Sequence, residues 1–138
     1  MIVDSSALLA ILRGEPEEEA FRSVLEVVPD SFISAGTLIE ARIMAATLNV
    51  RDELDELISE FGIRTVAVDD NQAGIAAAGF VMYGKGRHPA GLNFGDLFAY
   101  ALAKLRDEPL LFKGSDFAKT DLTQLPHFPG SDTVFSTV

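Results

Sequence analysis

Four acidic residues stand far apart in the sequence but in similar local settings. Asp4 follows an apolar pair at the start of the chain, and Glu40 lies early in a helical segment. Asp96 heads an apolar helix, and Asp116 follows a late apolar run. Carboxylate oxygens without nitrogen or sulfur donors suit the hard ions Mg²⁺ and Mn²⁺. If folding gathers the four acids, their repulsion raises their pKa values unless a cation is present, so the pattern predicts a divalent metal site.

Each acid, taken singly, also has a purely structural explanation. Asp4 could cap the first helix, and the segment from Thr37 to Glu40 fits a capping box. Asp96 could be an acid favoured by the dipole of a first helical turn, and Asp116 could hold a turn. The four explanations weaken when taken together, because four acids on one rim without a cation would repel one another.

In the stretch LNFGDLFAYALA, residues 92–103, the residue that caps the helix can be distinguished most clearly from the acid with a chemical role. Asn93 already offers a side-chain oxygen to the first free N–H groups of the helix. Gly95 gives the backbone room. We therefore expect Asn93 to be the cap and Asp96 to be free to point toward the strand ends.

Competing chemistries find little support. The chain has no cysteine, which excludes thiol catalysis, Cys-type zinc sites and disulfides. Residues 79–86 match G-x-x-x-x-G-K, but Gly86 replaces the Ser/Thr that would hold Mg²⁺, and the segment follows a helix. His88 and His127 lack an H-x-x-x-H partner, so surface roles are expected. Asp69-Asp70 is interpreted as the start of a helix. Ser5 and Ser6, which follow Asp4, are interpreted as residues that order the first turn of the helix after it.

Hydrophobic periodicity predicts short apolar strands that alternate with helices. Strands are expected at 2–3, 31–34, 63–68 and 110–112, and helices at 7–12, 16–28, about 36–49, 54–61, 69–83 and from about 93. Residues 84–91 read as a loop, and residues 133–138 as an edge strand or disordered. This alternation predicts a single α/β domain over residues 1–138, with a central parallel sheet covered by helices on both faces. In such sheets ligands bind beyond the carboxyl ends of the strands, where the four acids converge.

Charge is unevenly distributed along the chain. The net charge of -10 falls entirely within residues 1–80, which hold 5 basic and 15 acidic side chains, whereas residues 81–138 hold 6 of each. A broad basic face for nucleic acid is therefore excluded, so a nucleic acid substrate requires cations in the site. The start of the chain does not read as a signal peptide, and no run is long enough to span a bilayer, so a soluble cytoplasmic protein is expected.

The motifs around the four acids resemble those of PIN-domain ribonucleases, and specifically the VapC toxins of toxin-antitoxin pairs. They read MIVDSSALLAIL, GTLIEA, GKGRHPAGLNFGDLFAYALA and LLFKGSDFAKTDL, and the likeness runs from residue 1 to about residue 122 without a departure at the acids. By motif match, Asp4, Glu40, Asp96 and Asp116 are the acidic quartet, with Asp121 a candidate fifth acid.

The resemblance implies a metal-dependent endoribonuclease in which Mg²⁺ or Mn²⁺ activates a water for attack on the scissile phosphorus. Asp4 and Asp96 would be the chief ligands, with Glu40 and Asp116 binding directly, through water or to a second ion. It also implies a homodimer and inhibition by a VapB-type antitoxin, with a groove near residues 8–12 and 21–28 whose apolar side chains receive the partner while glutamates steer it. Lys85, Arg87, Lys113 and Lys119 flank the motifs and are candidate phosphate contacts. Two alternatives stay open: a catalytically silent PIN-like module that binds RNA or a protein, and a DNA nuclease or phosphatase.

Overall fold

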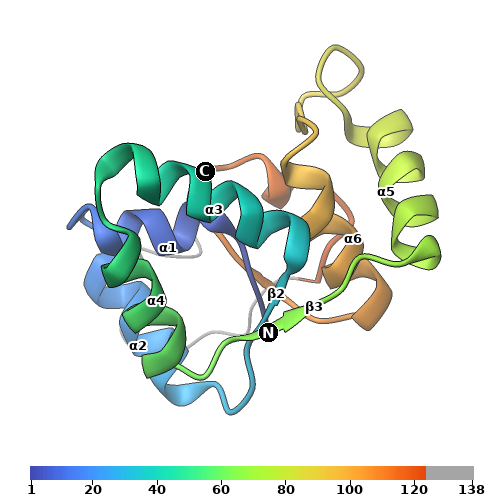
Figure 1. Ribbon diagram of the computed structural model, residues 1–138. Helices are drawn as coiled ribbons and strands as arrows, with labels where there is room; N and C mark the ends of the chain where they lie inside the picture. Colours follow the sequence, from blue (N-terminus) through green and yellow to red (C-terminus); the bar gives the residue numbers. More distant parts are fainter. Residues whose placement is uncertain (124–138) are drawn as a thin grey trace.

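A computed structural model describes residues 1–123 of the chain as a four-stranded parallel sheet between two layers of helices (Figure 1). The strands are β1 (Ile2–Val3), β2 (Phe32–Ser34), β3 (Arg64–Val66) and β4 (Leu110–Leu111), in the order β3-β2-β1-β4. Ile2 pairs with Phe32 on one side and with Leu110 on the other. The predicted three-layer α/β fold is confirmed, and β1 lies inside the sheet.

Successive residues of the short strands point into two separate cores. Val3, Ile33 and Leu111 belong to one apolar cluster, whereas Ile2 and Leu110 belong to the other, against which Phe32 also packs. The alternation follows from the two-residue period of a strand. Because both faces of the sheet are covered at its centre, β1 and β4 consist only of buried apolar residues, as expected for a parallel sheet, whereas the edge strand β3 exposes Arg64 and Thr65.

The first core lies under the helices that come early in the chain, and the second under the later ones (Figure 1). The helices are α1 (Ser5–Leu12), α2 (Glu18–Val27), α3 (Ala35–Leu48), α4 (Arg51–Glu60), α5 (Asp70–Tyr83) and α6 (Asp96–Arg106), followed by the 3₁₀ helix η1 (Phe117–Lys119). The helices α1 to α4 fill the first core, and α6 supplies five of the eleven buried residues of the second.

Helix and strand bounds agree with the sequence patterns to within a few residues. The largest shifts are at the starts of α4, expected at 54 and observed at Arg51, and of α6, expected at about 93 and observed at Asp96. The expected edge strand or disorder over 133–138, and His127, lie outside the described residues. No helix among residues 1–123 is both long and apolar enough to cross a membrane.

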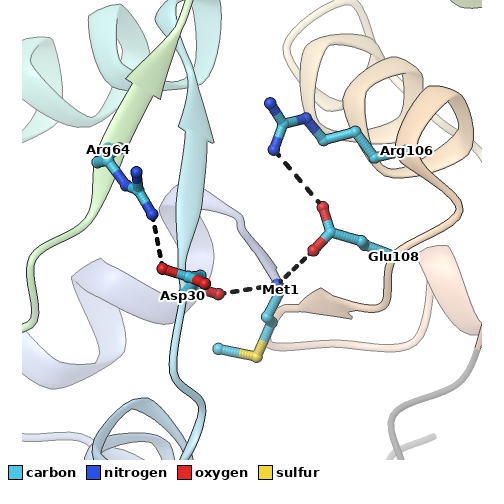
Figure 2. Close-up of polar contacts among 5 residues, drawn as sticks. All are labelled: Met1, Asp30, Arg64, Arg106 and Glu108. Atoms are coloured by element: carbon cyan, nitrogen blue, oxygen red, sulfur yellow. Dashed lines mark hydrogen bonds and ion pairs between the residues drawn. The ribbon is translucent and has the colours of Figure 1, made fainter.

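A polar cluster closes the amino end of the sheet (Figure 2). The Met1 ammonium donates hydrogen bonds to the carbonyl of Asp30 and to Glu108 Oε1, both at 3.0 Å. Glu108 also pairs with Arg106 at 3.7 Å, and Arg64 pairs with Asp30 at 2.6 Å. These contacts fix the end of β1 that is remote from Asp4, so the strand enters the site in a defined register.

Candidate metal and active site

Asp4 stands at the carboxyl end of β1 and is 3% exposed. Its backbone N–H donates to the carbonyl of Leu111 in β4, at 2.9 Å. Oδ2 accepts hydrogen bonds from Ser6 N at 3.1 Å and Ser6 Oγ at 2.6 Å, so Asp4 does cap α1, while Oδ1 is buried without a hydrogen-bond partner. Burial raises the pKa of Asp4 to about 6; the Ser6 hydrogen bonds oppose that rise, and the charges of Asp96 and Glu40 add to it.

Glu40 reaches the site from α3, where a serine from α1 orients it. Ser5 Oγ donates to Glu40 Oε1 at 2.7 Å, which links the carboxylate to the residue next to Asp4. The capping-box explanation of Glu40 is wrong, because Ser34 caps α3 by accepting from Gly36 N at 3.2 Å. The side chain of Glu40 is therefore committed to the site and not to the start of its own helix.

The turn before α6 holds Asp96 with two reciprocal hydrogen bonds. Asn93 Oδ1 accepts from Asp96 N, and Asp96 Oδ2 accepts from Asn93 N, both at 3.0 Å. The predicted cap by Asn93 is confirmed. Asp96 was expected to make no contact with the start of its own helix, and this is wrong for one of its two oxygens. Asp96 Oδ2 bonds the backbone of Asn93, as the acid three residues after the cap does in a capping box.

Gly95 lets this turn approach Glu40 closely. A Cβ at Gly95 would overlap Glu40 Oε2 and crowd Asn93 Oδ1, so a larger residue here would have to displace the Glu40 carboxylate. The room that the sequence predicted for the backbone is thus the space that the Glu40 carboxylate occupies.

Asp116 lies on the exposed loop between β4 and η1, at the same edge of the sheet. Burial raises the pKa of Asp96, the Asn93 hydrogen bond opposes the rise, and the charges of Glu40 and Asp116 add to it. The loop is tied to the first acid, because Lys113 N donates to Ser6 Oγ at 2.9 Å. The fold therefore brings the four predicted acids into one electrostatically coupled group.

The donor chemistry of this group fits a hard divalent cation. No three histidine, aspartate or glutamate side chains among residues 1–123 stand in the geometry of a closed ligand group. The group nevertheless contains a buried, unpartnered oxygen, Asp4 Oδ1, with two further carboxylates acting on it. A buried charge of this kind is unfavourable unless it is paired or coordinates a metal, and an all-oxygen set suits Mg²⁺ or Mn²⁺.

Asp121 lies in a different setting from the quartet. Its Oδ1 accepts from the Tyr100 hydroxyl at 2.8 Å, and its Oδ2 pairs with Lys104 Nζ at 2.6 Å. Burial alone would raise the pKa of Asp121, but the hydrogen bonds from Lys104 and Tyr100 bring it below its usual value. Both oxygens are thus engaged by side chains of α6.

Other polar residues near the motifs have structural partners. Lys113 Nζ pairs with Glu15 at 2.8 Å and with Glu17 at 2.9 Å, which neutralises it as a phosphate contact. Arg87 lies over the ring of Phe80, 5.7 Å from its centroid. His88, which was expected to have a surface role, is half-buried, and its Nδ1 accepts from Ala90 N at 3.0 Å.

Comparison with known proteins identifies the architecture. The PIN domain family matches residues 1–122, and Ribonuclease VapC42 from Mycobacterium tuberculosis is 43% identical over 129 residues, covering 88% of this chain and 96% of that protein. The chain belongs to the VapC ribonucleases of the PIN-domain family.

Solved structures share the fold of this PIN domain at low sequence identity. Mycobacterium tuberculosis VapC20, described as a Sarcin-Ricin loop cleaving toxin, superposes with a TM-score of 0.72 at 13% identity, covering 91% of this chain and 98% of that one. A toxin-antitoxin complex from Klebsiella pneumoniae gives 0.67 at 20% identity, covering 87% and 92%. Both matches extend over most of the PIN domain.

Two residues that position the acids were missed in the sequence as functional residues. Ser5 and Ser6 were expected only to order the first turn of α1, yet Ser5 holds Glu40 and Ser6 holds Asp4. Two hydroxyl residues directly after an acid at a strand end are the local signal. The partner of Ser5 depends on how α3 packs beside α1, which the local sequence does not encode.

Proposed function

We propose that this VapC ribonuclease is a Mg²⁺- or Mn²⁺-dependent endoribonuclease and that Asp4, Glu40, Asp96 and Asp116 hold the metal. The observation that carries the proposal is Asp4 Oδ1, a buried and unpartnered carboxylate oxygen beside two further acids. When bound, the metal supplies an activated water and neutralises charge on the scissile phosphate. The cytoplasm, where RNA is present, is the expected place of action.

The chain's own residues prepare the site for that chemistry. Ser6 fixes one oxygen of Asp4 and leaves the other for the cation, while Ser5 orients Glu40. The turn at Asn93 fixes one oxygen of Asp96. The helices α3 and α6 therefore present the carboxylates of Glu40 and Asp96 in defined rotamers. Such preorganisation lowers the entropic cost of assembling substrate and metal. In this proposal Asp121 supports Tyr100 and is not part of the metal set.

The direct test is cleavage of a labelled RNA pool by wild-type protein and by Asp96→Asn. We expect cleavage with Mg²⁺ or Mn²⁺, none with EDTA, and none by the variant, because asparagine is a poor ligand for a hard cation. Asparagine can still accept the Asn93 N–H bond, so the variant should fold. Asp70→Asn, an exposed acid at the start of α5, is the matched control and should cleave normally.

Two results would overturn this proposal. Cleavage that persists in EDTA would show that the reaction needs no metal. Full activity of Asp96→Asn would show that Asp96 only caps its helix. RNA binding without cleavage by the wild-type protein would favour the catalytically silent module instead. A DNA pool run in parallel separates the ribonuclease from a DNA nuclease.

We propose that a VapB-type antitoxin docks against the groove between α1, α2 and α4. The groove has a volume of about 360 Å³, and its walls carry four glutamates against one arginine. Its lining is Ile11, Leu12, Gly14, Glu18, Arg22, Glu53, Glu56, Leu57 and Glu60. The acidic walls suit a basic segment of the partner.

The apolar anchoring positions differ from those expected. Leu8, Phe21 and Val24 are at most 2% exposed and belong to the first core, so they cannot receive a partner. Ile11 and Leu57 line the groove but are each 3% exposed and belong to the same core, so the half-buried Leu12 is the apolar side chain of the lining that a partner can reach.

We also propose that the protein forms a homodimer. The support is a set of large apolar side chains more than half exposed on α3 and α5, namely Ile39, Ile43, Val81 and Met82. Sedimentation of the purified chain tests this directly, and a monomer at micromolar concentration would contradict it.

A further inference from the structure

Phe94 exposes its aromatic ring to solvent at the edge of the acidic group. Its side chain is 74% exposed, and it is the only exposed aromatic side chain among residues 1–123. It lies between Asn93, which caps α6, and Gly95, which touches the Glu40 carboxylate. The ring therefore projects from the turn that holds two of the four acids in place.

Neighbouring residues hold the ring of Phe94 in place. The reciprocal bonds between Asn93 and Asp96 close the turn on either side of Phe94. The ring of Phe98 stands edge-on to it, with centroids 5.3 Å apart and an angle of 86°. Phe98 in turn packs so closely on Gly36 that no Cβ would fit there. Gly36 lies in the first turn of α3, the helix that carries Glu40.

An apolar hollow continues from the ring between α5 and α6. It has a volume of about 270 Å³, and Phe94, Leu97, Phe98 and Ala101 form its α6 side. Phe94 thus stands between two features: the turn whose Asn93 and Gly95 contact the carboxylates of Asp96 and Glu40, and an apolar recess.

We propose that Phe94 stacks on an unpaired nucleobase next to the scissile phosphate, a role that rests on the proposed ribonuclease function. Bases of single-stranded RNA stack on exposed aromatic side chains, and this interaction needs no positive charge. That suits a chain whose site is acidic and whose Lys113 is already neutralised. A base displaced from its neighbours would meet the ring of Phe94 while its phosphate lies at the acids.

A substrate and protein double-mutant cycle tests the pairing. The substrate is a short single-stranded RNA that the wild-type protein cleaves at a mapped bond, made in two further versions with an abasic nucleotide on either side of that bond. On the intact RNA, Phe94→Ala should lower kcat/KM by roughly 5- to 100-fold, the range of base stacking on an aromatic residue. On one abasic RNA, wild type and Phe94→Ala should be equally slow, because the stacking partner is absent from both.

Matched variants separate stacking from other effects. Phe94→Trp should retain activity on the intact RNA, since it keeps an aromatic face. Val27→Ala, at an apolar residue that is 61% exposed on α2, should behave as wild type. Annealing the RNA to a complementary strand should abolish the difference between Phe94→Ala and wild type, because a paired base cannot reach the ring.

The outcomes distinguish this inference from the proposed function. If wild type cleaves and Phe94→Ala is unchanged on the intact RNA, or if its loss persists on both abasic RNAs, base stacking is wrong. Conversion of the protein from dimer to monomer by Phe94→Ala, seen by sedimentation, would assign the ring to a second copy of the chain and overturn the inference. If wild type cleaves no RNA, the proposed function fails and this inference fails with it.

Discussion

Raising the pH from about 4 to about 7 should destabilise the metal-free domain through Asp4. Its pKa is about 6 in the folded chain against an ordinary value of 3.8, so between these values the folded state binds more protons than the unfolded state. The free energy of unfolding then falls as the pH rises through this window and levels off above it. At 1.36 kcal/mol per pKa unit, the difference amounts to about 3 kcal/mol.

Asp4→Asn isolates this effect because asparagine keeps an oxygen for the Ser6 bonds but cannot ionise. A constant offset is expected from the buried amide, which lacks an acceptor at the position of Oδ1. Superimposed on that offset, the variant should gain up to about 3 kcal/mol relative to wild type between pH 4 and pH 7. Added Mg²⁺ should stabilise wild type at pH 7.5 more than at pH 4.5 and should not stabilise the variant.

The assay is urea unfolding in EDTA at several pH values, with wild type, Asp4→Asn and the control Asp70→Asn. The quantity of interest is the difference in unfolding free energy between wild type and each variant. A difference that stays constant from pH 4.5 to pH 7.5 for Asp4→Asn would refute the argument that burial and neighbouring acids perturb this carboxyl. A pH-dependent difference of the same size for Asp70→Asn would refute it as well.

Four further predictions concern the support of the acids and the partner. Gly95→Ala should fold normally because the backbone of Gly95 is helical, but it should lose roughly 100-fold in cleavage rate because the new Cβ displaces Glu40. The control Gly74→Ala, on the open surface of α5, should gain about 1 kcal/mol in unfolding free energy and keep its activity. Ser6→Ala should lose roughly 1–3 kcal/mol in urea unfolding and most of its cleavage. Asp121→Asn should lower the melting temperature slightly and keep cleavage, and loss of cleavage in a folded variant would place Asp121 in the metal set. Antitoxin affinity, measured by calorimetry, should weaken as salt rises from 50 to 500 mM, and a salt-independent affinity would contradict steering by the glutamates.

The fold was predictable because β1, β2 and β4 lie in short apolar runs that are followed by a polar residue, and because helices separate the strands along the chain. That pattern fixes a parallel sheet, and the parallel sheet places Asp4 and Asp116 at one edge. The order β3-β2-β1-β4 was not predictable, because nothing in the two residues of β1 says which strands flank them. The pairing of Ser5 with Glu40 was hidden for the same reason.

The antitoxin groove was misplaced for a different physical reason. The sequence of α1, SSALLAIL, is apolar on nearly every face, so its periodicity does not show which residues meet the sheet. In the fold Leu8 is buried, whereas Leu12 lines the groove. The pattern of α2 does place Phe21 and Val24 on one apolar face, but it does not show whether that face meets the core or a partner, and in the fold it meets the core.

The position of β1 inside the sheet also bears on how the toxin is made in the cell. Asp4 precedes the other acids along the chain, but its backbone N–H bonds Leu111, and the other acids follow at residues 40, 96 and 116. A partly synthesised chain lacks β4 and the loop that Ser6 holds, so it cannot assemble the acidic group. We expect a nascent or prematurely terminated chain to be inactive until residues 1–116 have all been synthesised.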